Sequence, residues 1–458
     1  MPESEATHDV VVLGGGSSGY ACALRAAQLG LSVALIEQDR LGGTCLHRGC
    51  IPTKALLHVA EVADTARDGD RFGVRSSVSG IDMPSVLAYQ DGVVARLHQG
   101  LTGLVSSASI DYITGTGTVT GPRSVEVNGA TLTGEHLVLA TGSRPRTLPG
   151  VRVGGRIITS DEALRLDYVP DSVIVLGGGV IGVEFASVWR SFGAVVAIVE
   201  ALPRLLPAEE DTVSKAVSRA FRKRTITIRT ETRLDSATQD DRSVTITLDD
   251  GTSLSADLLL VAIGRDPVSE GMGFDAAGVA VEQGFVTTDE RLRTSVPGVY
   301  AVGDLVAGLQ LAHRGFAHGV FVAEDIAGLD PAPVRDHTIP RVTYCDPEIA
   351  SVGLTEQQAR AEYGDVETYE YPLGGNGRSQ ILGTAGFVKL VRAPAGPVVG
   401  VHMVGARMGE QIGEAQLIVG WEAYPDDVAP FVHAHPTQNE ALGEAHLALA
   451  GKPLHAHS

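Results

Sequence analysis

The chain has 458 residues, too many for a single hydrophobic core, so we expect two to four domains. Its formal net charge of −19 at pH 7 argues against nucleic acid or an anionic membrane as a partner. Only four cysteines occur, which indicates a reducing compartment and not a disulfide scaffold. Residues 1–8 lack the basic start and apolar core of a signal peptide, so we expect a cytoplasmic protein.

A nucleotide-binding pattern begins at the first apolar run of the chain. Residues 10–13 predict a buried strand, which is followed by a glycine-rich turn, an alanine-rich helix and a second strand over 31–36. The three glycines of the turn and the acid that ends the second strand are Gly14, Gly16, Gly19 and Glu37. The first glycine permits the tight turn, the second lets a pyrophosphate approach the backbone, and the third lets helix and strand pack closely. The acid is suited to hold a ribose hydroxyl.

The same pattern returns 163 residues later in the chain. The repeated glycines and acid are Gly177, Gly179, Gly182 and Glu200. A further echo, at an offset of 122, relates residues 140–145 to residues 262–267. Since the two offsets differ by 41, the first copy carries an insertion of about that length. We therefore expect two dinucleotide-binding domains, one for FAD and one for NAD.

The second copy also decides between two pairs of alternatives. Residues 172–189 are the most apolar stretch, but three successive glycines and Glu184 suit a strand, a turn and a helix better than a membrane span. Glu200 would accept bonds from a free ribose hydroxyl and would repel a 2′-phosphate, and no arginine cluster follows it directly. NAD is therefore favoured over NADP.

The redox candidates lie inside the insertion, in residues 42–54. Cys45 and Cys50 are poorly placed for a bridge in a regular helix, but the glycines around them allow a distorted junction and so a disulfide. Lys54 follows Cys50 by one turn, where a cation favours a thiolate. Two ordinary buried thiols remain an alternative, and a metal site is not expected because no second Cys/His pair exists. Beside two nucleotide sites, a pair that opens and closes during a reaction is the favoured interpretation.

The remaining segments alternate between helical and strand patterns. Residues 60–110 are helical, and short strands follow over 111–140. A strand over 297–304 ends in Gly-Asp and precedes a helix over 311–327. Three prolines within 330–340 mark a linker to a last domain, which mixes strands with helices.

In these motifs the chain closely resembles the flavin-dependent disulfide oxidoreductases with two redox cysteines, and among them the dihydrolipoamide dehydrogenases. The resemblance spans essentially the whole chain. It rests on the cysteine stretch, the two glycine fingerprints and three further segments, ATG at 140–142, TSVPGVYAVGD at 294–304 and HPTQNE at 435–440. The chain departs from the usual pattern at His47 and Arg48, where Asn-Val is more common, and at Gly315 and His318.

The resemblance implies an α/β fold with two Rossmann-like dinucleotide-binding domains and a C-terminal α+β dimerisation domain. The expected domains are an FAD-binding domain with the redox insertion over 1–149, an NAD-binding domain over 150–268, a central domain that completes the FAD site over 269–336 and an interface domain over 337–458. The expected assembly is a homodimer built by the interface domain.

The resemblance also implies roles for individual side chains. Cys45 would exchange with the substrate, and Cys50 would lie against the flavin. Lys54 would lie near the reactive nitrogen of the flavin and pair with Glu184. These four residues would form the half of the catalytic site that one subunit supplies.

The other half would come from the second subunit. There His435 would act as the general base, and Glu440 would fix its tautomer. The neighbouring His433 is an alternative candidate, and only the match to the motif favours His435 over it. The FAD ligands expected by resemblance are Gly14, Gly16, Gly19, Glu37, Lys54, Thr141, Gly142, Asp304 and Ala312. The NAD ligands expected by resemblance are Gly177, Gly179, Gly182, Glu200 and Gly264.

The implied reaction is oxidation of protein-bound dihydrolipoamide to lipoamide with reduction of NAD⁺ to NADH. Partners would be lipoyl domains of a 2-oxoacid dehydrogenase complex or of the glycine cleavage system. The main alternative is an NADPH-dependent reductase of small disulfides, of the glutathione or mycothione type. Val180 disfavours it, because glutathione-reductase-like members carry a gating tyrosine there. The lack of any cysteine after Cys345 argues against mercuric reductase and the long thioredoxin reductases.

Overall fold

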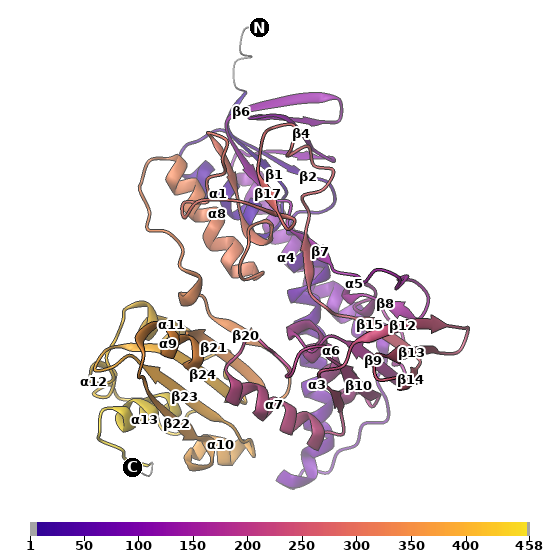
Figure 1. Cartoon of the computed structure of the whole chain (residues 1–458), viewed down its shortest axis with the longest axis vertical. Coiled ribbons are helices and arrows are strands. Elements are labelled where there is room, and N and C mark those ends of the chain that lie inside the picture. The colour runs from indigo at the N-terminus through magenta and orange to yellow at the C-terminus, as the bar shows by residue number, and fades with distance from the viewer. Residues whose placement is uncertain (1–6, 456–458) are drawn as a thin grey trace.

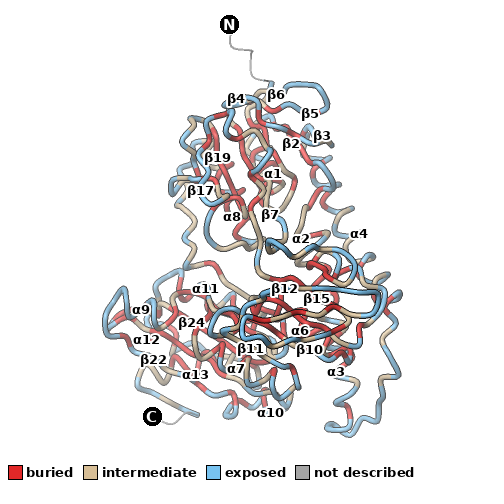
Figure 2. The backbone as a smooth tube through the Cα atoms, turned by 45° about the vertical axis from the view of Figure 1, so that its right-hand side comes forward, coloured by how far each residue is buried: buried red, intermediate tan, exposed pale blue. Residues whose placement is uncertain are grey.

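The computed structural model describes residues 7–455 and arranges them around three main β-sheets (Figure 1). The first sheet lies at the end of the molecule that carries the N-terminus, and the other two lie side by side at the opposite end. The central strands of each sheet are buried, whereas most connecting loops are exposed (Figure 2). Within the described range, no helix combines the length and the apolarity needed to cross a membrane.

The first sheet has the strand order β3-β2-β1-β6-β5-β4, and β19 pairs with β6. Its strands are β1 (His8–Leu13), β2 (Val33–Glu37), β3 (Asp111–Thr114), β4 (Thr118–Gly121), β5 (Ser124–Val127), β6 (Ala130–Leu139) and β19 (Val299–Ala301). Five of them are parallel, while β4 and β5 pair antiparallel with each other and with the start of β6. All of β2 is buried, as expected for an apolar strand with both faces covered.

The second sheet repeats the centre of the first. Its strands are parallel in the order β11-β10-β9-β15-β8. These strands are β8 (Ile157–Ile158), β9 (Ser172–Leu176), β10 (Val195–Val199), β11 (Thr227–Arg229) and β15 (Leu258–Val261). The unit β9, α6 (Val180–Phe192) and β10 corresponds to β1, α1 (Ser17–Gln28) and β2. The predicted pair of Rossmann-like units is confirmed.

The insertion after β2 consists of helices. They are α2 (Gly43–Arg48), α3 (Cys50–Arg67), the 3-10 turn η1 (Asp68–Phe72) and α4 (Met83–Ser107). The second unit has instead α7 (Asp211–Lys223) and the ladder β12 (Leu234–Gln239), β13 (Val244–Leu248) and β14 (Ser253–Ala256). Because α3 packs against α6, the insertion joins the two nucleotide-binding units.

Shorter elements connect these units. They are α5 (Ser160–Ala163), the pair β7 (Ser143–Pro145) with β16 (Arg265–Pro267), and the pair β17 (Val281–Glu282) with β18 (Phe285–Val286). The chain then returns to the first unit, since β19 joins the first sheet and α8 (Ala312–Ile326) packs on α1. Residues 299–326 therefore extend the first unit.

The third sheet is antiparallel, with the order β20-β21-β24-β23-β22. Its strands are β20 (Arg341–Thr343), β21 (Glu348–Gly353), β22 (Glu367–Pro372), β23 (Phe387–Arg392) and β24 (Val398–Gly405). The helices of this region are α9 (Glu356–Tyr363), α10 (Gly377–Leu382), α11 (Ile412–Gly420), α12 (Pro425–Val428) and α13 (Glu440–Leu449). Contacts of α11 and α13 with the sheet form the C-terminal core, and α7 of the second unit reaches β24.

A buried ionic cluster fixes this C-terminal region to the second unit. Lys389 Nζ donates to Glu210 Oε1 at 2.8 Å and to Glu356 Oε2 at 2.6 Å, and Arg341 Nε donates to Glu209 Oε1 at 3.0 Å. The Lys389 side chain is 6% exposed. Removing one partner from such a cluster would leave an uncompensated buried charge, so the two regions are held in one relative position.

Helix α8 contains two glycines and a buried histidine, and the structure explains Gly319 and His318 but not the unusual Gly315. A Cβ atom at Gly319 would lie 2.3 Å from Ser18 O and 2.8 Å from Cys22 N, so this glycine lets α8 approach the backbone of α1. At Gly315 a Cβ atom would lie 3.4 Å from Ser18 Cβ, which is an ordinary contact. The buried His318 accepts a hydrogen bond from Gly303 N at 3.3 Å through Nδ1.

We expect Gly319→Ala to lower the free energy of unfolding by about 1–3 kcal/mol, because the added methyl group has no space against the α1 backbone. Gly315→Ala is the matched control in the same helix. It should leave stability unchanged or raise it by up to about 1 kcal/mol, since alanine favours a helix interior. Thermal unfolding of the two variants at equal flavin content measures the difference. Equal destabilisation by both substitutions would contradict the packing argument.

Candidate active site

One large cavity, of about 1260 Å³, lies between the carboxyl ends of the two parallel sheets. It exceeds the roughly 300–1000 Å³ of an ordinary ligand pocket, as a site for two extended dinucleotides requires. The expected site residues that line it are Gly14, Gly16, Glu37, Cys45, Cys50, Lys54, Thr141, Gly142, Gly177, Gly179, Glu184, Glu200, Gly264, Asp304 and Ala312. The structure thus brings residues from both nucleotide-binding units into one space.

Four expected residues do not line this cavity. Gly19 and Gly182 lie behind it, where a Cβ atom would come within 1.7 Å of Gly14 O and 2.0 Å of Gly177 O. They allow helix and strand to pack, as the fingerprint requires, without facing a ligand. His435 and Glu440 lie in the C-terminal region, away from the cavity of their own chain.

The two glycine turns have the same geometry. Gly14 and Gly177 adopt φ values of 111° and 109°, and a Cβ atom on either would come within 2.4 Å of a carbonyl oxygen of the neighbouring strand end. A Cβ atom built on Gly16 or on Gly179 would have no neighbour closer than 4.0 Å. Their backbone is therefore open to the cavity, which suits a bound pyrophosphate.

The two strand-end acids are also equivalent. Glu37 Oε2 accepts from Gly15 N at 2.7 Å, and Glu200 Oε2 accepts from Gly178 N at 2.6 Å. The other oxygen, Oε1, accepts from the backbone N–H two residues later, at 2.8 Å for Glu37 and at 2.7 Å for Glu200. A carboxylate has about four acceptor sites, so both retain capacity for ribose hydroxyls. These acids and open turns fit FAD in the first unit and NAD in the second.

The surroundings of Glu200 contain an arginine that sequence reasoning missed. Arg204 is turned from the cavity and bonds Asp211, Pro207 O and Glu209 O. Arg233, however, lines the cavity together with Glu200. Arg233 is 33 positions after Glu200, too far along the chain to be recognised as part of an arginine cluster that follows the acid.

The cysteines lie where α2 meets α3. Cys45 is in α2, Cys50 is the first residue of α3, and Gly49 makes the sharp break between the helices. Both are free thiols, so the structure represents the dithiol form of the pair. The hydrogen bond with Cys45 lowers the pKa of Cys50 to about 7 against the effect of burial, and Lys54 adds to the lowering. The same hydrogen bond and burial raise the pKa of Cys45.

Lys54 connects three regions of the molecule. Its Nζ donates to Glu184 Oε1 at 2.9 Å and to Oε2 at 2.8 Å, and it lies 4.9 Å from the centre of the Tyr344 ring. Tyr344 N donates to Glu184 Oε1 at 2.9 Å. Burial alone would lower the pKa of Lys54, but Glu184 outweighs it and leaves this pKa raised. Tyr344, from the C-terminal region, carried no signal in the sequence.

A second network holds the turn that contains Asp304. Its Oδ2 accepts from Ser143 Oγ at 2.5 Å, and Arg265 donates to Ser143 Oγ and Ser143 O, both at 2.7 Å. His318 supports the adjoining Gly303, and burial lowers the pKa of this imidazole to about 4, so it acts as a neutral acceptor. Arg265 lines the cavity and was not identified from sequence.

His433 and His435 each have their own acid. His435 Nδ1 bonds Glu440 Oε1 at 2.8 Å, and Glu440 Oε2 accepts from Thr437 N at 2.8 Å. His433 Nε2 bonds Glu414 Oε1 at 2.9 Å. The His435 side chain is 77% exposed, whereas that of His433 is 12% exposed. Of His433 and His435, it is therefore His435 that presents a free Nε2 to an approaching molecule. His455, which bonds Glu444 Oε1 through Nδ1 at 2.9 Å and is 67% exposed, has the same arrangement.

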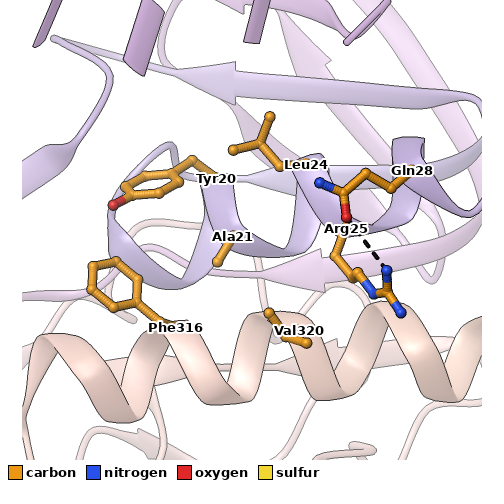
Figure 3. A pocket seen from close by; sticks show the side chains of 7 residues that line it. All are labelled: Tyr20, Ala21, Leu24, Arg25, Gln28, Phe316 and Val320. Atoms are coloured by element: carbon orange, nitrogen blue, oxygen red, sulfur yellow. Dashed lines mark hydrogen bonds between the residues drawn. The ribbon is translucent and has the colours of Figure 1, made fainter. Parts of the chain in front are cut away.

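A shallow groove of about 310 Å³ lies between α1 and α8, outside the main cavity (Figure 3). Tyr20 and Phe316 face each other at one end with ring centres 5.6 Å apart, and Arg25 and Gln28 lie at the other end. Burial raises the pKa of Tyr20 to about 12, and the charge of Cys45 adds to this effect. Cys45 does not line this groove.

Two family profiles match the chain. Residues 8–319 match the family described as pyridine nucleotide-disulphide oxidoreductase, and residues 339–446 match its dimerisation domain. The dihydrolipoyl dehydrogenase of Bacillus subtilis (strain 168) is 40% identical over 98% of this chain and 99% of its own length. The Mycobacterium tuberculosis (H37Rv) protein of the same name is 40% identical over 97% of this chain and 98% of its own.

Solved structures are similar over nearly the whole chain. LpdA from Mycobacterium tuberculosis has a TM-score of 0.90 at 27% identity, covering 96% of this chain and 99% of its own. The HOCl-induced flavoprotein disulfide reductase RclA from Escherichia coli, as its Cu(II) complex, has a TM-score of 0.87 at 25% identity. That match covers 97% of this chain and 100% of RclA.

We expect substitutions at the two ends of the Lys54–Glu184 pair to shift the pKa of Cys50 in opposite directions. Lys54→Met should raise it by about one unit or more, because a cation that favours the thiolate is lost. Glu184→Gln should lower it, because an anion that disfavours the thiolate is lost. A pH titration of thiolate absorbance in the dithiol protein measures both. Shifts of the same sign would contradict the electrostatic assignment.

Proposed function

This chain belongs to the pyridine nucleotide-disulphide oxidoreductase family, and we propose that it oxidises protein-bound dihydrolipoamide with NAD⁺ as acceptor. The observation that carries the proposal is the dithiol with unequal pKa values, which shares one cavity with two dinucleotide-binding units. Relatives at 40% identity over nearly the whole chain bear the name dihydrolipoyl dehydrogenase.

The cavity fits FAD in the first unit and NAD in the second, as the paired turns and acids indicate. When bound, the flavin carries two electrons between the dithiol and the nicotinamide. Glu37 and Glu200 would hold the two riboses, and the glycine turns would hold the pyrophosphates. Lys54, kept charged by Glu184, would stabilise negative charge beside Cys50.

The side chains of the chain would handle the sulfur chemistry. A substrate thiolate attacks Cys45 of the oxidised pair, which forms a mixed disulfide and releases Cys50 as a thiolate. The second substrate thiolate attacks the substrate sulfur held on Cys45, which closes lipoamide and releases Cys45. The two electrons of the substrate are then on the cysteine pair. The lowered pKa of Cys50 makes it the better leaving group of the two.

The protons of the substrate thiols need a base, and we assign that role to His435. Its Nδ1 is engaged by Glu440, so Nε2 is the nitrogen that receives a proton. Because His435 lies away from the cavity of its own chain, the base would serve the cysteines of a second copy. Four large apolar side chains are exposed in the same C-terminal region, and a second copy of the chain that packed there would cover them. They are Leu417, Trp421, Phe431 and Val432, which are 49%, 76%, 74% and 96% exposed.

Lipoyl domains of a 2-oxoacid dehydrogenase complex or of the glycine cleavage system are the proposed carriers of the substrate. Cys45 lines the main cavity, so the substrate arm would have to reach the cysteines there. A reducing, cytoplasmic location stays a prediction from the small number of cysteines in the chain.

Initial rates with two substrate pairs test the proposal directly. We expect NADH with lipoamide to exceed NADPH with glutathione disulfide or mycothione by more than about tenfold, because the Glu200 carboxylate repels a 2′-phosphate. Cys50→Ser should remove lipoamide turnover while the protein keeps its flavin. Faster turnover of the NADPH pairs would favour the small-disulfide reductase. Full activity of Cys50→Ser would refute the assigned chemistry.

Mixed dimers test whether two chains form each site. Neither His435→Gln nor Cys50→Ser homodimers should turn over lipoamide, because each lacks one half of every site. Random mixing gives about half heterodimers with one complete site each, so roughly a quarter of the wild-type activity should return. A mixture of two batches of the same variant is the control. If the mixture stays inactive while heterodimers are detected, the shared site is wrong.

A further inference from the structure

The two unusual residues between the cysteines face different surroundings. His47 Nε2 bonds Leu41 O at 2.9 Å, and its ring packs edge-on against His98, so it is committed to the protein interior. Arg48 lines the main cavity. Thr44, one turn earlier on the same face of α2, lines it too. Arg48 therefore adds a cation to the cavity that more common sequences of the resembling family lack.

A chain of hydrogen bonds ties the Arg48 guanidinium to the first glycine turn. Arg48 Nη2 donates to Asp39 Oδ2 at 2.5 Å, and Asp39 N donates to Glu37 Oε1 at 2.8 Å. The other oxygen of Glu37 accepts from Gly15 N at 2.7 Å. The start of α2 also touches this turn, since a Cβ atom at Gly43 would lie 2.7 Å from Gly16 Cα. The guanidinium is thus held on the phosphate-binding side of the cavity.

Arg48 is less fully engaged than three other cations that line this half of the cavity, whereas Arg144 likewise makes one hydrogen bond, to Glu270 Oε2 at 3.2 Å. Lys54 is bound bidentately to Glu184, Arg146 bonds Asp266 Oδ1 and Arg265 O, and Arg265 bonds Ser143 twice. The Arg48 side chain is 47% exposed and uses only Nη2 among the described residues. Arginine has five donors in a planar fork, so Arg48 retains a free edge that suits two phosphate oxygens.

We propose that Arg48 binds the pyrophosphate of FAD and that Asp39 orients it for this contact. The inference rests on the FAD site of the proposed function and adds a ligand from between the redox cysteines. A cation at this place offsets the carboxylates of Glu37, Asp39 and Asp304, which line the same cavity and disfavour a dianionic group. Because Arg48 and Cys45 lie in the same helix, α2, this helix would then both bind FAD and carry a redox cysteine.

Release of FAD from the diluted holoenzyme, followed by the rise in flavin fluorescence, tests the assignment. At low salt Arg48→Met should release FAD about tenfold faster or more, because a charge-assisted hydrogen bond is lost while the aliphatic stem remains. In 1 M salt the difference should shrink, since the wild-type contact is screened. Arg48→Lys keeps the charge and should release FAD at an intermediate rate.

Arg40→Met is the matched control. Arg40 Nε also approaches Asp39, at 3.8 Å from Oδ1, but Arg40 does not line the cavity. This variant should release FAD at the wild-type rate. Equal release by wild type and Arg48→Met, a difference undiminished in 1 M salt, or an equal effect of Arg40→Met would overturn the inference. A wild-type protein without flavin would instead defeat the proposed function.

Discussion

The ion pair between Lys54 and Glu184 is the contact on which the arrangement of the site depends. It joins the helix that carries Cys50 to the first helix of the second nucleotide-binding unit, and Tyr344 adds the C-terminal region. A buried pair of this kind is tolerated only with good geometry and further hydrogen bonds, which the bidentate contact and Tyr344 N provide. The same pair sets the charge beside the Cys50 thiol, so fold and chemistry depend on one interaction.

The parts of this molecule that the sequence predicted are those specified by local backbone geometry. A glycine at 14 or 177 is required because a side chain would strike a neighbouring carbonyl, and a strand end is required for the acids at 37 and 200. Such constraints leave a readable pattern within about 25 residues. The constant offset between the copies therefore predicted two equivalent units, and the structure repeats even their hydrogen bonds.

Other features could not be predicted from the pattern, because they join residues far apart in the chain. Tyr344 reaches Lys54 across 290 positions, and Arg265 reaches Ser143 across 122. The internal repeat makes positions 143 and 265 equivalent, but equivalence does not show that two residues touch. The direction of Arg48 is likewise a tertiary property, since the sequence shows an unusual arginine but not which way it turns. His435 does not line the cavity of its own chain, and only the resemblance to the family assigned it to the site.

The Lys389 cluster has a consequence for assembly. Since buried charges lock the C-terminal region onto the second nucleotide-binding unit, the surface that carries His435 has its orientation before any second copy arrives. Association then sacrifices little conformational entropy, because no hinge has to close and few side chains have to be reordered. In the proposed shared site, the position of the imidazole relative to the opposite chain would therefore follow from the fold of each chain.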